Sequence, residues 1–272
     1  MNIDKLKKIK TVISHDHCAD GIASAIIIKD ILPNVEVKFM QYGTQALKDL
    51  KSSDGLLFVD FSPPADRVKE FVEAGCLCLD HHKTAKEVIE AFGENGVFGD
   101  EKTEPGVCGA VLAFRHVWSR MTIDSLWRDK TGVGQFAILA GIRDTWQRQD
   151  PSWREACAQK EMLLFYNDWM DVRFNQTILA ERMIVGRLIL EKWERDVARV
   201  VKESYRFALN GLNVACLEGV HYSSDAAELI GTDADVVIAF SYKAVINDIK
   251  LIYSTRSKTN FNCADFAKRF GG

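Results

Sequence analysis

Three apolar runs of the sequence each end directly in a side chain that can bind a metal ion. Residues 12–15 read VISH, residues 57–60 read LFVD, and residues 77–82 read LCLDHH. Helix-like stretches, such as residues 21–32 and 83–92, alternate with these runs. Strands that alternate with helices in this way predict right-handed βαβ units and therefore a parallel sheet. The first half of the chain is thus constrained to an α/β fold.

The second half of the chain begins with helical patterns and ends with strand-like ones. A Pro-Gly pair at 105–106 precedes helical stretches, and residues 176–204 carry one long amphipathic pattern. Short strand-like runs then return, and they predict a smaller α/β domain: 205–209, 214–218, 235–241 and 248–255. We expect a first domain over residues 1–170, a connecting helix over 171–204 and a second domain over 205–272.

The long amphipathic pattern has three interpretations. It could join two domains, pack against a partner chain in a homodimer, or cover the core of one domain. The sequence does not decide among them.

Charge and composition exclude some classes of function. The net charge is −3 and charged residues make up 27% of the chain, so there is no basic excess of the kind that coats nucleic acid without specificity. A nucleic-acid substrate would have to be bound locally and be short. No run is long enough for a secretory signal or a membrane-spanning helix, which predicts a cytoplasmic protein without a membrane partner. We interpret the seven cysteines as reduced thiols.

The polar side chains at the strand ends are expected to meet. In an open parallel sheet, the loops after the carboxyl ends of the strands gather at one edge, where ligands bind. A lone Asp after a strand is more often a helix cap than a ligand, but three coincident strand ends favour a metal site. The residues expected to converge are His15, Asp16, Asp20, Asp60, Asp80, His81 and Asp144.

The chemistry of this donor set indicates the kind of metal. Carboxylates and imidazoles without a set of thiolates suit Mn²⁺ or Mg²⁺ better than a structural zinc ion. Two such ions could clamp the oxygens of a phosphoryl group and generate hydroxide at neutral pH. The sequence therefore predicts a metal-dependent hydrolase.

Four segments resemble, in the same order, the motifs of the DHH phosphoesterase superfamily. Residues 14–24 (SHDHCADGIAS) are similar to its first motif, 59–63 (VDFSP) to its second, 79–82 (LDHH) to its third and 141–146 (GIRDTW) to its fourth. The C-terminal segments 253–257 (YSTRS) and 264–272 (ADFAKRFGG) resemble the DHHA1 domain. The resemblance spans nearly the whole chain. It implies a DHH catalytic domain, a connecting helix and a DHHA1-like substrate-binding domain.

The resemblance also implies an activity and a set of site residues. The family consists of phosphoesterases, among them RecJ-type single-strand exonucleases, nano-RNases, cyclic-dinucleotide phosphodiesterases and inorganic pyrophosphatases, so the resemblance implies a phosphoesterase. By position, Asp60 would bridge two metal ions, His82 would contact the scissile phosphate, and Asp80 would complete the catalytic group. One ion would take Asp20, His81 and Asp144, and the other would take His15. Arg256, Gly271 and Gly272 would hold the phosphate or base of the substrate.

The sequence departs from the family at two places. The family usually has an Asp, a ligand of the second metal, where this chain has Cys18. Asp16, His17 or the Cys18 thiolate could take its role, or the second ion binds weakly. The family's glycine run also continues beyond the point where this chain stops at Gly272, so we expect a truncated glycine-rich end.

Hydrolysis of phosphodiester bonds in short oligonucleotides or dinucleotides is the leading hypothesis. A pyrophosphatase-like hydrolase of phosphoanhydrides is an alternative, but pyrophosphatases of this family carry a different C-terminal domain. Another alternative is a nucleotide-binding protein whose metal site has degraded at Cys18. A zinc site of the metallo-β-lactamase type is excluded, because Gly21 stands where its Asp-His pair needs a histidine.

Overall fold

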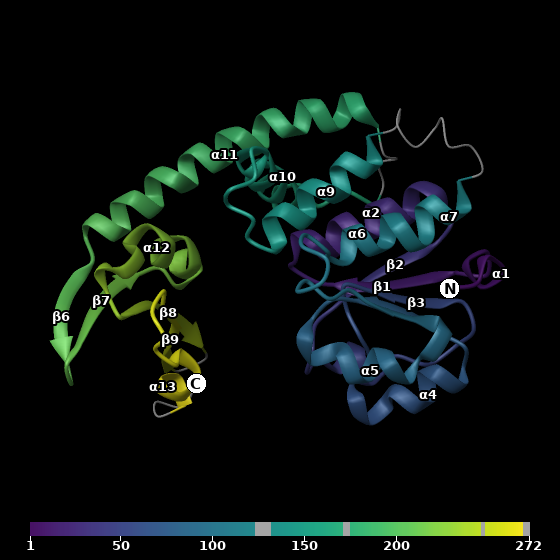
Figure 1. Ribbon diagram of the computed structural model, residues 1–272, viewed down its shortest axis with the longest axis horizontal. Coiled ribbons are helices and arrows are strands. Elements are labelled where there is room, and N and C mark those ends of the chain that lie inside the picture. Colours follow the sequence, from purple (N-terminus) through teal and green to yellow (C-terminus); the bar gives the residue numbers. More distant parts are fainter. Residues whose placement is uncertain (123–131, 171–174, 246–247, 269–272) are drawn as a thin grey trace. The chain divides into compact units, whose positions relative to one another are not determined.

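The computed structural model describes residues 1–122, 132–170, 175–245 and 248–268. The chain divides into two compact units, Met1–Leu190 and Glu191–Gly272. The division lies within the longest described helix, α11 (Gln176–Lys202). This arrangement of a parallel-sheet unit, a long helix and a smaller mixed-sheet unit confirms the predicted fold class (Figure 1). The domain boundaries at residues 170 and 204 remain a prediction.

A five-stranded parallel sheet forms the centre of the first unit. The strand order is β2-β1-β3-β4-β5, and every neighbouring pair is parallel. As in any sheet of βαβ units, the carboxyl ends of the strands therefore lie at one edge. The strands are β1 (Thr11–His15), β2 (Glu36–Met40), β3 (Leu56–Val59), β4 (Leu77–Asp80) and β5 (Gly96–Phe98).

Helices cover both faces of this sheet, and successive strand residues alternate between them. Val12 packs into the core below the larger helical layer, whereas its neighbour Ile13 packs into the core on the other face. The larger layer holds α2 (Ala19–Ile31), α6 (Gly109–Ala113), α9 (Val133–Asp144) and α10 (Trp153–Phe165). The other face is covered by α4 (Val68–Glu73) and α5 (Lys86–Ala91), as Figure 1 shows.

Short helical elements complete the first unit. They are α1 (Ile3–Leu6), α3 (Gln45–Lys48) and α7 (Ser119–Met121), the π-helical turn Phe114–Trp118, and the 3₁₀ turns Ala65–Arg67, Lys83–Ala85 and Gly93–Asn95. Helix α10 was not predicted from the sequence. Its buried face includes Ala156 and Gln159 beside Met162, which gives only a weak apolar period.

The second unit is built on a mixed four-stranded sheet with the order β6-β7-β8-β9. Strands β7 and β8 are parallel, and the two outer pairs are antiparallel. Its core lies between the sheet, α12 and the last turns of α11, where Val197 and Val200 are buried. The elements are β6 (Tyr205–Leu209), β7 (Leu212–Glu218), α12 (Ser223–Ile230), β8 (Val236–Val245), β9 (Asp248–Arg256) and α13 (Cys263–Lys268), with 3₁₀ turns at Val220–Tyr222 and Gly231–Asp233.

Two expectations from the sequence concern membrane-spanning helices and the state of the cysteines. Among the described helices, none has the length and apolar character needed to cross a bilayer. All seven cysteines are free thiols.

Candidate metal centre

Asp60 occupies the middle of a cluster of acidic and histidine side chains at the carboxyl edge of the parallel sheet. It directly follows β3 and has a left-handed backbone, with φ of 53°. Its side chain is 1% exposed. One carboxylate oxygen, Oδ1, lies 3.2 Å from His81 Nε2, and the other, Oδ2, lies 3.9 Å from His15 Nδ1. The two oxygens of Asp60 thus face two different groups of donors.

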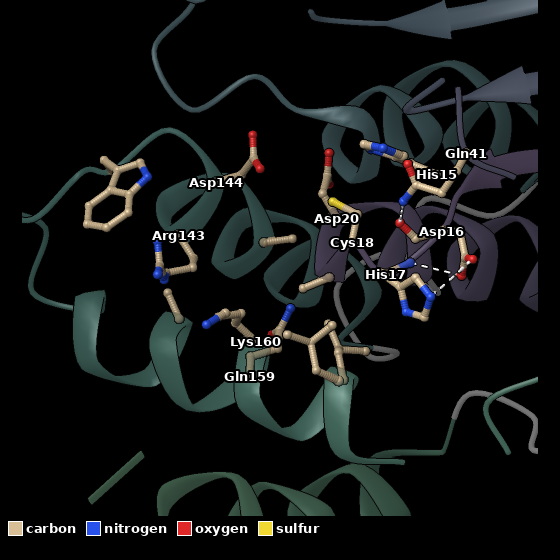
Figure 2. Close-up of a pocket in the computed structure, with 16 residues that line it drawn as sticks. His15, Asp16, His17, Cys18, Asp20, Gln41, Arg143, Asp144, Gln159 and Lys160 are labelled. Carbon is tan, nitrogen blue, oxygen red and sulfur yellow. Dashed lines mark hydrogen bonds and ion pairs between the residues drawn. The ribbon is translucent and has the colours of Figure 1, made fainter. Parts of the chain in front are cut away.

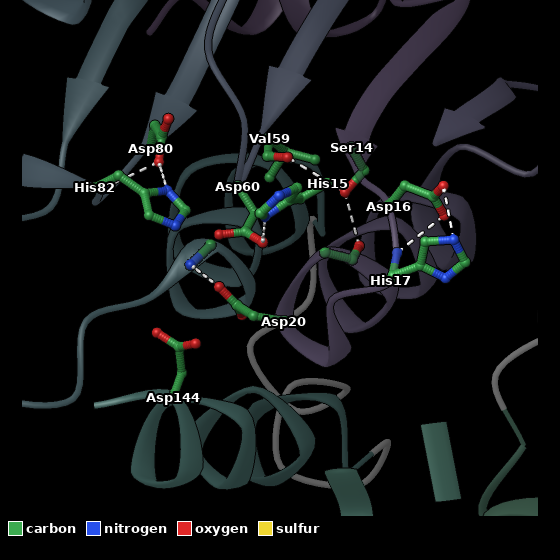
Figure 3. A network of polar contacts seen from close by, with 12 residues as sticks. Ser14, His15, Asp16, His17, Asp20, Val59, Asp60, Asp80, His82 and Asp144 are labelled. Carbon is green, nitrogen blue, oxygen red and sulfur yellow. Dashed lines mark hydrogen bonds and ion pairs between the residues drawn. The ribbon is translucent and has the colours of Figure 1, made fainter. Parts of the chain in front are cut away.

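The first donor set consists of Asp20, His81 and Asp144. Asp20 lies in the first turn of α2, His81 follows β4, and Asp144 ends α9. His81 Nε2 is 3.6 Å from an oxygen of Asp20 and 3.6 Å from an oxygen of Asp144. Figure 3 shows the carboxylates of Asp20, Asp60 and Asp144 directed toward a common space. One donor atom from each of the three residues in the set lies within 4.8 Å of the others, close enough to bind one ion.

The second donor set consists of His15, Cys18 and Asp60. His15 ends β1, and Cys18 occupies the N-cap position of α2. A nitrogen of His15, the sulfur of Cys18 and an oxygen of Asp60 also lie within 4.8 Å of one another.

Asp16 and His17, the other candidates for this second set, contact each other instead. Asp16 Oδ1 accepts a hydrogen bond from the His17 backbone N–H at 2.9 Å, and Asp16 Oδ2 lies 3.4 Å from His17 Nε2. The His17 side chain is 87% exposed. Neither residue belongs to a donor group among the residues that the structure describes.

Asp80 and His82 form a pair beside the cluster. Asp80 Oδ1 lies 2.7 Å from His82 Nδ1 and also accepts hydrogen bonds from the backbone N–H groups of His81 and His82. The hydrogen bond to Asp80 raises the pKa of His82, although burial opposes this. Asp80 therefore fixes the ring and favours its protonated form. Together with Asp60 and His81, this pair makes a third group of donors.

The arrangement depends on backbone groups that the sequence analysis did not identify. The N–H groups of Gly109 and Ala110, at the start of α6, donate to the two oxygens of Asp20 at 2.6 and 2.8 Å. A Cβ atom at Gly109 would overlap the Cβ of Asp60 and lie 2.9 Å from Asp20 Oδ2. Gly109 is thus required for the close approach of α6 to the cluster. No acidic, histidine or strand-end pattern marks this residue in the sequence.

Ser14 connects the elements that carry the ligands. Its hydroxyl lies 2.8 Å from the Gly21 carbonyl and 3.2 Å from the Val59 carbonyl, so that α2, β1 and β3 are tied together (Figure 3). Because Asp60 follows Val59 directly, the hydrogen bond from Ser14 to the Val59 carbonyl helps to set the distance between the two donor sets.

The electrostatics of the cluster favour a bound cation. Burial, followed by the charges of Asp20 and Asp144, raises the pKa of Asp60. Burial and Asp20 raise the pKa of Asp144 to about 6. Burial, Asp60 and Asp20 likewise raise the pKa of the Cys18 thiol. These groups repel one another when ionised, and a divalent ion would relieve that repulsion.

Unsatisfied donor atoms support the same conclusion. Within the part of the chain that the structure describes, His15 Nδ1, Asp60 Oδ2 and Asp80 Oδ2 are buried and make no hydrogen bond. Buried polar atoms are normally paired. Two of these atoms are on His15 and Asp60, residues of the second donor set, so the residues present fit a metal ion there.

A pocket of about 340 Å³ lies against the cluster within the first unit. His15, Cys18, Asp20 and Asp144 line one side of it, and Arg143, Gln159 and Lys160 line the other, as Figure 2 shows. The guanidinium of Arg143 lies 4.3 Å from the ring centroid of Trp146, which also lines the pocket. The pocket therefore has the acidic cluster on one side and the two cationic side chains of α9 and α10 on the other.

Of the three predicted substrate-binding residues, the structure describes Arg256, which lies in the second unit. Arg256 ends β9 and is exposed, and its Nε donates a hydrogen bond to Ser224 Oγ of α12 at 3.3 Å. Its Nη1 donates to the carbonyl of Thr255. Gly271 and Gly272 lie outside the described residues.

Sequence comparison finds no family model and no curated protein that matches the chain. Solved structures do match. One is the pGpG-specific phosphodiesterase PggH from Vibrio cholerae, with a TM-score of 0.58 and 10% identity over 97% of this chain and 89% of that one. Another is the DHH domain of a member of the s1p family of ribosomal proteins, with a TM-score of 0.55 and 11% identity over 88% and 72% of the two chains.

These matches define the fold class of the chain. It is a two-unit α/β protein with an Asp/His cluster at the ends of its parallel strands. Its fold is that of the DHH-domain proteins over nearly the whole length, and the cluster is DHH-like, which confirms the resemblance noted in the sequence. At such low identity the likeness concerns the fold.

Proposed function

We propose that the chain is a metal-dependent phosphodiesterase that hydrolyses short oligonucleotides or dinucleotides. The observation that carries this proposal is the position of Asp60, with one oxygen toward His81 and the other toward His15. Such a carboxylate is suited to bridge two divalent ions. PggH, which shares the fold, is described as a pGpG-specific phosphodiesterase, and this supports a dinucleotide as substrate.

The donor sets assign residues to the ions. Asp20, His81 and Asp144 would hold one ion, and His15 with Cys18 would hold the other, with Asp60 shared between them. When bound, such ions supply Lewis-acid stabilisation of the charge that develops on a phosphoryl group. These ligands would hold both ions at the carboxyl edge of the parallel sheet.

His82 is proposed to bind the scissile phosphate. Its Nδ1 is held by Asp80 at 2.7 Å, which leaves Nε2 as the nitrogen that can donate to a substrate oxygen. The side chain is 40% exposed, in contrast to the buried Asp80. A protonated imidazole in this position donates a charge-assisted hydrogen bond to the phosphate.

The pocket beside the cluster supports a substrate with more than one anionic or polar group. Arg143 and Lys160 lie across the pocket from Asp20 and Cys18. Cations placed there complement the negative charge of a nucleotide. Gln159, a polar residue, and Leu163, an apolar one, also line the pocket.

We expect Mn²⁺ to support hydrolysis of short RNAs, short DNAs or pGpG, and excess chelator to abolish it. The reason is that the carboxylates and imidazoles of the cluster are metal ligands, and an ion held by them would supply the Lewis acidity for hydrolysis. Products from a panel of these substrates, with inorganic pyrophosphate included, would be resolved by length. Undiminished hydrolysis in chelator would refute the metal mechanism. Cleavage of pyrophosphate alone would favour the phosphoanhydride alternative, and metal binding without any hydrolysis would favour the binding protein.

Replacing Arg256 by alanine is expected to raise KM for the dinucleotide about ten- to a hundred-fold, the effect of losing a charge-assisted contact of roughly 1.5–3 kcal/mol. The kcat should change much less, because all the proposed metal ligands lie in the first unit. Steady-state kinetics on the dinucleotide and on a small generic phosphodiester would test this.

Arg206→Ala is the matched control, since Arg206 is an exposed arginine of the same sheet, on β6. It should leave both substrates unaffected. An Arg256→Ala variant that loses activity equally on both substrates would show that Arg256 acts on the chemistry or the fold rather than on substrate binding.

A further inference from the structure

The two donor sets that meet at Asp60 differ in their chemistry. Asp20, His81 and Asp144 offer only oxygen and nitrogen. The second set contains the sulfur of Cys18 together with a nitrogen of His15 and an oxygen of Asp60. One set is thus made of hard and borderline donors, and the other includes a soft one.

Neither Asp16 nor His17, the two residues before Cys18, replaces its sulfur in the second donor set. Asp16 and His17 pair with each other, and His17 is 87% exposed. Cys18 is held by its place at the N-cap of α2, and its sulfur lies within 4.8 Å of the donor atoms of His15 and Asp60. Among the described residues, Cys18 is therefore the side chain that completes the second set.

The other two members of the set are prepared to bind a ligand. His15 Nδ1 and Asp60 Oδ2 are buried atoms that make no hydrogen bond within the described part of the chain, although they lie 3.9 Å apart. The Asp60 side chain is 1% exposed. These two atoms point to a bound ion independently of the cysteine.

We propose that the position formed by His15, Cys18 and Asp60 takes a thiophilic divalent ion of the Zn²⁺ type, while the position formed by Asp20, His81 and Asp144 takes Mn²⁺ or Mg²⁺. This inference rests on the proposed function and adds the metal preference of each position. Thiolate ligands select zinc-like ions, whereas carboxylate ligands suit Mn²⁺ and Mg²⁺. On binding, the Cys18 thiol releases its proton to solvent, and the charges of the thiolate and of Asp60 balance the 2+ charge of the ion.

Cobalt provides a direct test, because Co²⁺ reports thiolate ligation through a charge-transfer band in the near ultraviolet. The metal-free full chain would be titrated with Co²⁺ and then with Zn²⁺ or Mn²⁺. We expect the band in the wild type, its loss on addition of Zn²⁺, and little change with Mn²⁺ at the same concentration.

Variants of the cysteine make the test specific. Cys18→Ser and Cys18→Asp should abolish the band. Cys157→Ser should retain it, since Cys157 is a half-buried thiol of α10 that belongs to none of the donor groups formed by the described residues. Loss of the thiolate should weaken Zn²⁺ binding at this position at least about ten-fold, because even the outer partners of a metal site produce losses of that size. Cys18→Asp should in addition bind Mn²⁺ more tightly than the wild type. Circular dichroism would establish that each variant is folded.

A wild-type spectrum without the band, or a band that persists in Cys18→Ser, would overturn the inference. Hydrolysis of the dinucleotide is measured on the same samples, so that the two ideas can fail separately. Hydrolysis with Mn²⁺ but no band leaves the proposed function standing without the thiophilic position. A band without hydrolysis under any metal supports the thiophilic position and refutes the function.

Discussion

Replacement of Asp60 by asparagine is expected to lower the rate of hydrolysis by at least about three orders of magnitude while the fold stays intact. Among the described residues, Asp60 is the one whose two oxygens face both donor sets. Loss of this bridge would remove charge stabilisation and the shared ligand together, each an effect of several kcal/mol. Asparagine has the same shape and tolerates a left-handed backbone, so φ of 53° is no obstacle.

The same variant makes a prediction about stability. Burial and the neighbouring carboxylates raise the pKa of Asp60, so the ionised group destabilises the metal-free fold. Asp60→Asn without metal should therefore melt at a higher temperature than the metal-free wild type. Mn²⁺ should stabilise the wild type and have little effect on the variant. Asp66→Asn, an exposed acidic residue shortly after β3, is the control. If Asp60→Asn keeps a tenth of the wild-type rate of hydrolysis, the site is misplaced.

Replacement of His81 by alanine is expected to have an effect of similar size, about a thousand-fold, together with loss of bound metal. His81 Nε2 lies 3.2 Å from Asp60 and 3.6 Å from both Asp20 and Asp144, so it contacts every acidic member of the first set. Without the imidazole, the set of Asp20, His81 and Asp144 keeps only its two carboxylates. An ion at this position would lose its nitrogen ligand, and with it part of the Lewis-acid chemistry.

His82→Ala separates metal binding from substrate binding. His82 is bonded to Asp80 and lies beside the first set, so its loss should reduce the rate but leave the metal content at the wild-type value. His17→Ala should also keep the metal, because His17 pairs with Asp16 on the surface. Metal content after dialysis and steady-state rates would be measured for all three variants. Full metal content in His81→Ala, or metal loss in His17→Ala, would contradict the assignment.

Much of the fold could be predicted from the sequence because its signals are local. Strands β1, β3 and β4 are short apolar runs, and each is followed by a helix that starts within a few residues. That alternation predicts a parallel sheet, and a parallel sheet places His15, Asp60 and His81 at one edge. Asp144 lies far along the chain, at the end of α9 rather than of a strand. It is among the residues expected to converge, and the resemblance of its segment to a family motif assigns it to one of the ions.

The remaining parts of the site depend on close packing that no local pattern encodes. Gly109 matters because of the space between α6 and Asp60, and its sequence context is an ordinary start of a helix. The choice among Asp16, His17 and Cys18 depends on the turn after β1, where His17 has φ of 55° and faces solvent. Such a turn places Cys18, and not its neighbours, beside His15. Sequence reasoning left these three residues as alternatives for that reason.

The left-handed backbone at Asp60 has a consequence for the life of the protein in a cell. A non-glycine residue in this region is less favourable by roughly 1–3 kcal/mol, and it persists only where the surrounding structure holds it. In this chain the strained residue also lies in a buried cluster of carboxylates, and their repulsion further destabilises the fold when no ion is bound. A change of one or two kcal/mol alters the abundance of a protein several-fold through degradation of its unfolded fraction. Starvation for divalent metal should therefore shorten the half-life of this chain, and its level should follow the metal supply.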